Sequence, residues 1–96
     1  MNVDEVQDEI QRHHKIQVID VRSKEEFEQA HIPIAINISI LDLPNNLNTL
    51  DKSTQYITAC GKGGGRSSDA SKILKEKGFK SYWLCGGTYK WLNIQN

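Results

Sequence analysis

The sequence predicts an α/β domain with a mainly parallel central sheet and helices on both faces. Two observations carry this prediction: short β-branched segments alternate with segments of helical periodicity, and the alternation continues along all 96 residues. The length fits one domain, so we expect residues 1–96 to form a single domain. Twelve acidic residues balance twelve basic ones, which argues against a nucleic-acid partner because that function needs a basic excess.

The first half of the chain contains two expected helices and two expected strands. Ser23 is followed three residues later by Glu26, a capping-box pattern that marks the start of a helix. Apolar residues three and four apart predict the first helix, and β-branched runs predict the strands. In chain order the expected elements are a helix over 3–12, a strand over 16–21, a helix from Lys24 to about Gln29, and a strand over 35–38.

The second half begins with a leucine-containing segment, 41–50, that we expect to form a short or broken helix because Pro44 interrupts it. A strand over 55–59 then leads directly into Cys60. A helix capped by Ser67 or Ser68 should follow, ending before Gly78. The remaining expected elements are a strand over 81–84 and a last helix after Gly86-Gly87.

Membrane, secretory and metal-binding classes find no support in the sequence. No apolar run approaches the roughly 20 residues of a membrane span, and the first residues lack the pattern of a secretory signal. We therefore expect a cytoplasmic protein without a membrane partner. The two cysteines, Cys60 and Cys85, have no His or Cys neighbour at metal-ligand spacing, so we expect free thiols and no metal site.

The segment after the third expected strand carries the chemistry. Glycines allow successive backbone N–H groups to surround an anion, and the start of the next helix adds its positive end. Such a field lowers the pKa of the Cys60 thiol below its free value of about 8.5 and makes it a nucleophile. We expect Cys60 to be catalytic and the following residues to bind a small anionic substrate: Gly61, Lys62, Gly63, Gly64, Gly65, Arg66 and Ser67.

Five segments, in this order, span nearly the whole chain: Ile19-Asp20-Val21-Arg22 with Glu26-Phe27, then His31-Ile32-Pro33, then Ala35-Ile36-Asn37-Ile38, then the loop from Cys60 to Ser67, and finally Leu84-Cys85-Gly86-Gly87 with Trp91. Together they resemble the single-domain rhodanese (sulfurtransferase) homology family. The resemblance implies the rhodanese-like three-layer fold over residues 1–96.

The resemblance also implies a reaction. Cys60 would take a sulfane sulfur from a small anionic donor, such as thiosulfate or a persulfide, and form a persulfide. A thiophilic acceptor, either a small thiol or a protein, would then collect the sulfur. No metal or organic cofactor is implied.

The chain departs from the family pattern at two places. Ile34 stands where the family usually has Gly, and Arg66 follows Cys60 by six residues rather than five. The longer Cys-x5-Arg spacing is that of related phosphatases and arsenate reductases, which is the main alternative function. Sulfur transfer is favoured because Ala59 replaces the His of those enzymes and the loop has no acidic residue. A third alternative is a non-catalytic module that binds an anion or a partner.

Four other residues are candidates for minor roles. We expect Asp20 and Arg22 to be structural, as charges at a strand end that pair with Glu26 or a neighbouring residue, and His31 to be a hydrogen-bonded turn residue. Cys85 follows the fourth expected strand, so it is either a packing thiol or a thiol that resolves an oxidised Cys60.

Overall fold

The computed structural model describes residues 1–12, 14–62 and 65–93. Its four strands form one sheet in the order β2-β1-β3-β4, and all of the pairings between them are parallel. This confirms the predicted α/β class. The strands are β1 (Ile16–Asp20), β2 (Ile36–Asn37), β3 (Gln55–Ala59) and β4 (Lys80–Trp83).

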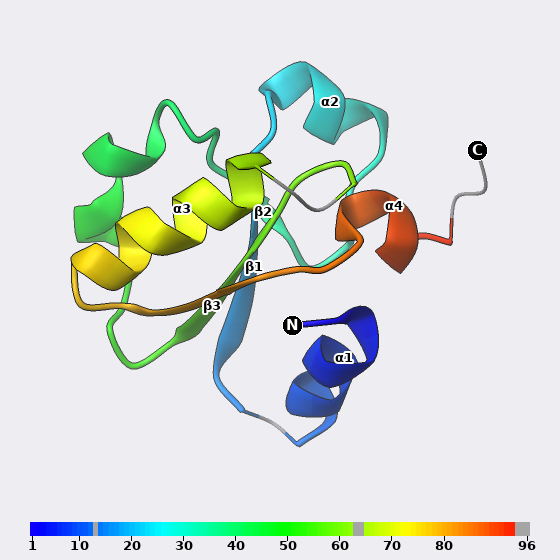
Figure 1. Ribbon diagram of the computed structural model, residues 1–96, viewed down its shortest axis with the longest axis horizontal. Coiled ribbons are helices and arrows are strands. Elements are labelled where there is room, and N and C mark those ends of the chain that lie inside the picture. The colour runs from blue at the N-terminus through cyan, green and yellow to red at the C-terminus, as the bar shows by residue number, and fades with distance from the viewer. Residues whose placement is uncertain (13, 63–64, 94–96) are drawn as a thin grey trace.

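Helices cover both faces of the sheet, as predicted (Figure 1). The helix α3 and the two 3₁₀ turns lie on one side, α1 and α4 lie on the other, and α2 lies beyond the carboxyl ends of the strands. None of the described helices is long and apolar enough to cross a membrane. The bounds are α1 (Val3–Gln11), α2 (Lys24–Gln29), η1 (Leu43–Asn45), η2 (Leu47–Thr49), α3 (Gly65–Glu76) and α4 (Gly87–Trp91).

The core has two halves because successive strand residues point to opposite faces. Ile19 and Tyr56 face the α3 side, whereas Val18 and Ile57 face the α1 side. Cys60 belongs to the α3-side cluster and is itself buried. The nucleophile predicted from the sequence is therefore anchored in the core rather than carried on an exposed loop.

Several predicted boundaries were wrong. The strands expected over 16–21 and 81–84 span Ile16–Asp20 and Lys80–Trp83, and two other elements differ more. The helix expected to begin after Ser67 or Ser68 begins earlier, at Gly65, and Ser67 lies inside it. Ser67 is fully buried, and its carbonyl oxygen accepts a hydrogen bond of 2.7 Å from the Thr58 hydroxyl. Packing against β3 therefore outweighs the preference of serine for a cap. The second strand is shorter than expected, because only Ile36 and Asn37 pair with β1 as strand residues.

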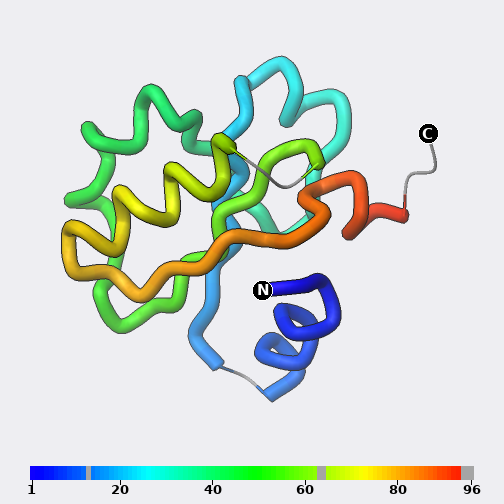
Figure 2. Tube along the Cα trace, in the orientation of Figure 1, coloured from blue at the N-terminus to red at the C-terminus, as the bar shows by residue number. Residues whose placement is uncertain are grey.

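The connections after β1 and β3 run in opposite directions across the sheet. From β1 the chain passes through α2 to β2 at one edge, and from β3 it passes through α3 to β4 at the other edge. The Cα trace shows both connections leaving the same end of the two adjacent strands (Figure 2). In parallel sheets a crevice opens at such a switch point, and ligands bind there.

Gly86→Ala is expected to lower the free energy of unfolding by at least about 2 kcal/mol. Gly86 has a φ of +83°, and an added Cβ would lie 2.6 Å from the Cβ of Lys90, which cannot move away without shifting α4. Gly65→Ala is the matched control, since a Cβ there meets nothing within 4 Å among the described residues. Urea denaturation measures both variants. An equal loss of stability in both would contradict the steric explanation.

Candidate functional site

A pocket of about 480 Å³ opens at the carboxyl end of β3. It brings together five of the predicted site residues, namely Cys60, Gly61, Lys62, Gly65 and Arg66, and adds Glu26 and Tyr89. The predicted residue Ser67 is fully buried and touches Cys60 instead of lining the pocket. Gly63 and Gly64 were predicted to bind substrate and lie outside the described residues.

The Cys60 side chain is 5 % exposed and forms part of the pocket wall. Its Sγ lies 3.3 Å from the hydroxyl oxygen of Ser67. When Cys60 is a thiolate, that hydroxyl can donate a hydrogen bond to the sulfur and so stabilise the negative charge. The arrangement places the Cys60 sulfur beside a buried hydroxyl and in the wall of the pocket.

Backbone hydrogen bonds from α4 hold the beginning of the loop. The N–H of Thr88 donates to the carbonyl oxygen of Cys60 at 2.8 Å, and the N–H of Tyr89 donates to that of Gly61 at 3.1 Å. A Cβ built on Gly61 would lie 3.4 Å from the Tyr89 ring, so the ring packs closely on the loop backbone. The start of α4 therefore fixes the backbone at Cys60 and Gly61.

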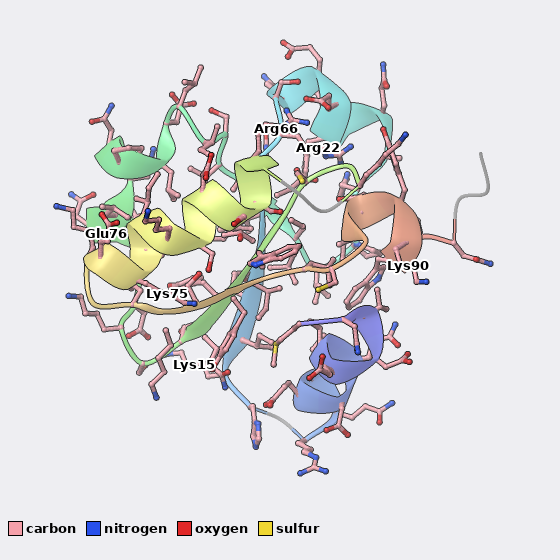
Figure 3. The ribbon with its side chains drawn as sticks, in the orientation of Figure 1. Lys15, Arg22, Arg66, Lys75, Glu76 and Lys90 are labelled. Carbon is pink, nitrogen blue, oxygen red and sulfur yellow. The ribbon has the colours of Figure 1, made fainter. Side chains whose placement is uncertain are left out.

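Arg66 extends from the first turn of α3 toward α2 (Figure 3). There its Nη1 and Nη2 donate to Oε1 and Oε2 of Glu26 at 2.9 and 3.2 Å. The two-pronged guanidinium that the sequence motif assigned to a substrate oxyanion thus holds a carboxylate of the protein itself. Arg66 and Glu26 are 45 % and 38 % exposed, so this ion pair lies at the open side of the pocket.

The Glu26 carboxylate is held by two groups at once. Hydrogen bonds, first from Arg66 and then from the backbone N–H of Ser23, together lower the pKa of Glu26 from its ordinary value of 4.5 to about 2. The same pairing raises the pKa of Arg66. Ser23 and Glu26 also form the capping box predicted for α2. Glu26 is therefore ionised at neutral pH.

This ion pair predicts a small pH dependence of stability. A carboxyl group whose pKa is lower in the folded state stabilises the fold above its ordinary pKa, and the contribution is lost as the pH falls from 4.5 to about 2. Because both side chains are partly exposed, solvent limits the effect to about 1 kcal/mol or less.

Glu26→Gln isolates the effect, since glutamine keeps the capping box and removes the charge. The wild-type protein should be more stable than this variant at neutral pH, and the gap should close toward about pH 2. Urea midpoints at several pH values measure it. A gap that widens in acid would contradict the assignment.

A second ion pair lies in the core beside the site. Both oxygens of Asp20 accept from the Arg22 guanidinium, with Nη2 2.7 Å from Oδ2 and Nε 2.9 Å from Oδ1. Nη2 also donates to the carbonyl oxygen of Ala30. The two side chains are 1 % and 2 % exposed. The predicted ion pairing at this strand end is confirmed with a neighbouring residue as the partner, whereas Glu26 pairs with Arg66 instead. The hydrogen bond to Asp20 raises the pKa of Arg22.

Two pocket residues, Glu26 and Tyr89, were not predicted from the sequence. From the sequence, Glu26 is interpreted as a capping residue, as part of the first family segment and as a possible ion-pair partner of Asp20 or Arg22, but not as a pocket residue. His31 is a hydrogen-bonded turn residue as predicted, with Nδ1 2.9 Å from the carbonyl oxygen of Phe27. Cys85 is an exposed free thiol and does not line this pocket. Within the described part of the chain, no three acidic, His or Cys side chains gather as metal ligands.

Comparison with protein families gives a match over residues 2–94 to the rhodanese-like domain. Among curated proteins, the "Putative sulfurtransferase YtwF" of Bacillus subtilis is 36% identical over 86 residues, which cover 90% of this chain and 82% of that protein. The "Thiosulfate sulfurtransferase GlpE" of Coxiella burnetii is 31% identical over 84 residues, covering 86% and 78% of the two chains.

Solved structures agree with this match. A rhodanese-like domain protein from Staphylococcus aureus superposes with a TM-score of 0.85 at 31% identity, covering 95% of this chain and 88% of that one. A rhodanese-related protein from Thermoplasma volcanium also gives 0.85, at 27% identity, with 97% and 89% covered. The family predicted from the sequence motifs is confirmed, and the chain belongs to the rhodanese-like domain family.

Proposed function

We propose that this protein is a sulfurtransferase that carries a sulfane sulfur on Cys60. The observation that carries the proposal is the position of the Cys60 sulfur. It is the nucleophile of a pocket that also holds Lys62 and Arg66, at the carboxyl end of a central parallel strand. The relatives named as sulfurtransferases support the same chemistry. Residues 1–96 act as one domain in this proposal.

The reaction has two steps. The Cys60 thiolate attacks the outer sulfur of the donor, a new S–S bond forms, and the bond between that sulfur and the rest of the donor breaks. The leaving group, sulfite from thiosulfate or a thiolate from a persulfide, takes the electron pair of the broken bond. A thiol or another thiophile then attacks the outer sulfur of the Cys60 persulfide and regenerates the thiolate.

Phosphate-ester hydrolysis fits the pocket less well, although the Cys-x5-Arg spacing would suit it. Such a reaction benefits from a general acid that protonates the leaving group. Glu26 is the acidic residue that lines the pocket among the described residues, and its pairing with Arg66 lowers its pKa to about 2. A carboxyl group with that pKa is ionised at neutral pH and has no proton to donate.

The test is the mass of the intact protein after incubation with thiosulfate or with a small alkyl persulfide. The expected result is an added mass of one sulfur atom, removed by a reducing thiol and located on the Cys60 peptide by fragmentation. An aryl phosphate and arsenate are assayed in parallel. Turnover of either, with no sulfur adduct from any donor, would overturn the proposal.

A further inference from the structure

The charges around the pocket balance one another instead of forming a strongly cationic site. Lys62 and Arg66 contribute positive charge, while Glu26 contributes an ionised carboxylate that occupies the forked side of the Arg66 guanidinium. When Cys60 is a thiolate, the described side chains that line the pocket sum to no net positive charge. An incoming anion therefore meets a competitor for Arg66 that is already bound.

Hydrogen bonds within α2 keep the Glu26 carboxylate in its position beside Arg66. Glu26 is fixed by the capping box of α2, in which its Oε1 accepts from the Ser23 backbone N–H at 3.2 Å and from the Ser23 hydroxyl at 3.1 Å. The carboxylate is thus held in position from its own helix while it holds Arg66 from the other. A substrate that is to bind the same Nη1–Nη2 fork of Arg66 must displace both of these charge-assisted hydrogen bonds.

We propose that Glu26 determines donor specificity by keeping Arg66 neutralised, so that the physiological sulfur donor is an alkyl persulfide rather than a dianion such as thiosulfate. This inference rests on the proposed function. A dianion gains most from a free guanidinium and suffers most from a nearby carboxylate. An alkyl persulfide carries at most a single negative charge at its reacting end, so it depends far less on Arg66.

Both donors transfer one sulfur atom to Cys60, and they differ in the leaving group. Cys60 thiolate and thiosulfate give the Cys60 persulfide and sulfite, a dianion that departs past Glu26. Cys60 thiolate and an alkyl persulfide give the same Cys60 persulfide and an alkyl thiolate. No further oxidant or reductant is needed in either step, because the electron pair of the broken S–S bond leaves with the departing sulfur.

The experiment measures how fast the Cys60 persulfide forms in a single turnover, by mass spectrometry of quenched samples at constant ionic strength. The donors are thiosulfate and hydroxyethyl persulfide, each rate being divided by the rate of free cysteine with the same donor. The wild-type protein should favour hydroxyethyl persulfide by at least about tenfold. Glu26→Gln should raise the thiosulfate rate about five- to tenfold and change the hydroxyethyl persulfide rate less than about twofold.

Two further variants separate this role from a structural one. Glu25→Gln removes the same charge from an exposed position on the same helix and should leave the donor ratio unchanged. In an Arg66→Met background, Glu26→Gln should raise the thiosulfate rate less than it does with Arg66 present, because no guanidinium is released and only the repulsion from the carboxylate is relieved.

The outcomes distinguish the two proposals. If Cys60 takes sulfur from both donors but Glu26→Gln leaves their ratio unchanged, donor selection by Glu26 is overturned and sulfur transfer stands. If no donor loads Cys60 in any variant, the proposed function itself fails. Should Glu26→Gln not fold, the wild-type ratio alone decides, since equal normalised rates for the two donors would contradict the inference.

Discussion

Asp20→Asn is expected to lower the free energy of unfolding by about 3–5 kcal/mol, because it leaves the Arg22 guanidinium buried without its counter-charge. Arg22 is 2 % exposed and has three hydrogen bonds to the Asp20 carboxylate. A guanidinium cannot lose its proton, so the charge stays. For a domain of this size the loss corresponds to a fall in thermal midpoint of about 15 °C or more, measured by calorimetry.

The complementary change removes the guanidinium instead of the carboxylate. Arg22→Met leaves the Asp20 carboxylate buried without its partner, so it should also destabilise the fold. The double variant Asp20→Asn/Arg22→Met should be more stable than Asp20→Asn alone, since no buried charge remains. The amide oxygen introduced at position 20 would still accept the backbone N–H of residue 22, as the Asp20 carboxylate does at 3.0 Å. A double variant as unstable as the single one would contradict this account.

The buried pair matters to the site because of where it lies. Asp20 is the last residue of β1 and pairs in register with Ala59, the last residue of β3. Cys60 follows Ala59 directly. The side-chain amide of Asn37 donates to the carbonyl oxygens of Asp20 and Arg22, and these bonds tie the same corner to β2. The ion pair and the Asn37 amide thus hold together the carboxyl ends of β1 and β2, next to the end of β3 that leads into Cys60.

Elements with a strong local signal were predicted to the residue. The capping box places α2 at Lys24–Gln29, and the β-branched run before Cys60 places β3 at Gln55–Ala59. The segment 41–50 is broken as predicted, with Pro44 in the first turn of η1. The start of α3 was missed because burial of Ser67 against Thr58 decides it, and burial depends on the whole fold rather than on neighbouring residues.

The sequence predicted only those site residues that lie close to one another along the chain. Cys60, Gly61, Lys62, Gly65 and Arg66 follow one another closely, so a motif reveals them together. The partner of Arg66 is Glu26, which is 40 residues earlier in the chain. Their meeting depends on β1 and β3 being neighbours whose connections diverge, and strand order is not encoded in any local pattern. The ion pair between Arg66 and Glu26 could therefore be found only from the structure.

Cys60→Ser is expected to lower the rate of sulfur transfer by at least about a thousandfold with either donor. A serine hydroxyl is a poor nucleophile at neutral pH, and its oxygen cannot carry the sulfane sulfur as a persulfide. Because serine differs from cysteine by one atom and Ser67 remains in hydrogen-bonding range, the fold should survive with a loss of about 1 kcal/mol. Steady-state thiocyanate formation from cyanide measures the rate, and urea denaturation measures the stability.

Cys85→Ser is the matched control, because it removes the other thiol at an exposed position outside the pocket. It should keep the rate within about twofold of the wild-type protein, since neither step of the proposed reaction uses a second cysteine. A large loss in Cys85→Ser, with Cys60 still accepting sulfur, would instead assign Cys85 to the release of sulfur from Cys60. If Cys60→Ser retained activity that Cys85→Ser lost, the sulfur would be carried on Cys85 and the pocket described above would not be the active site.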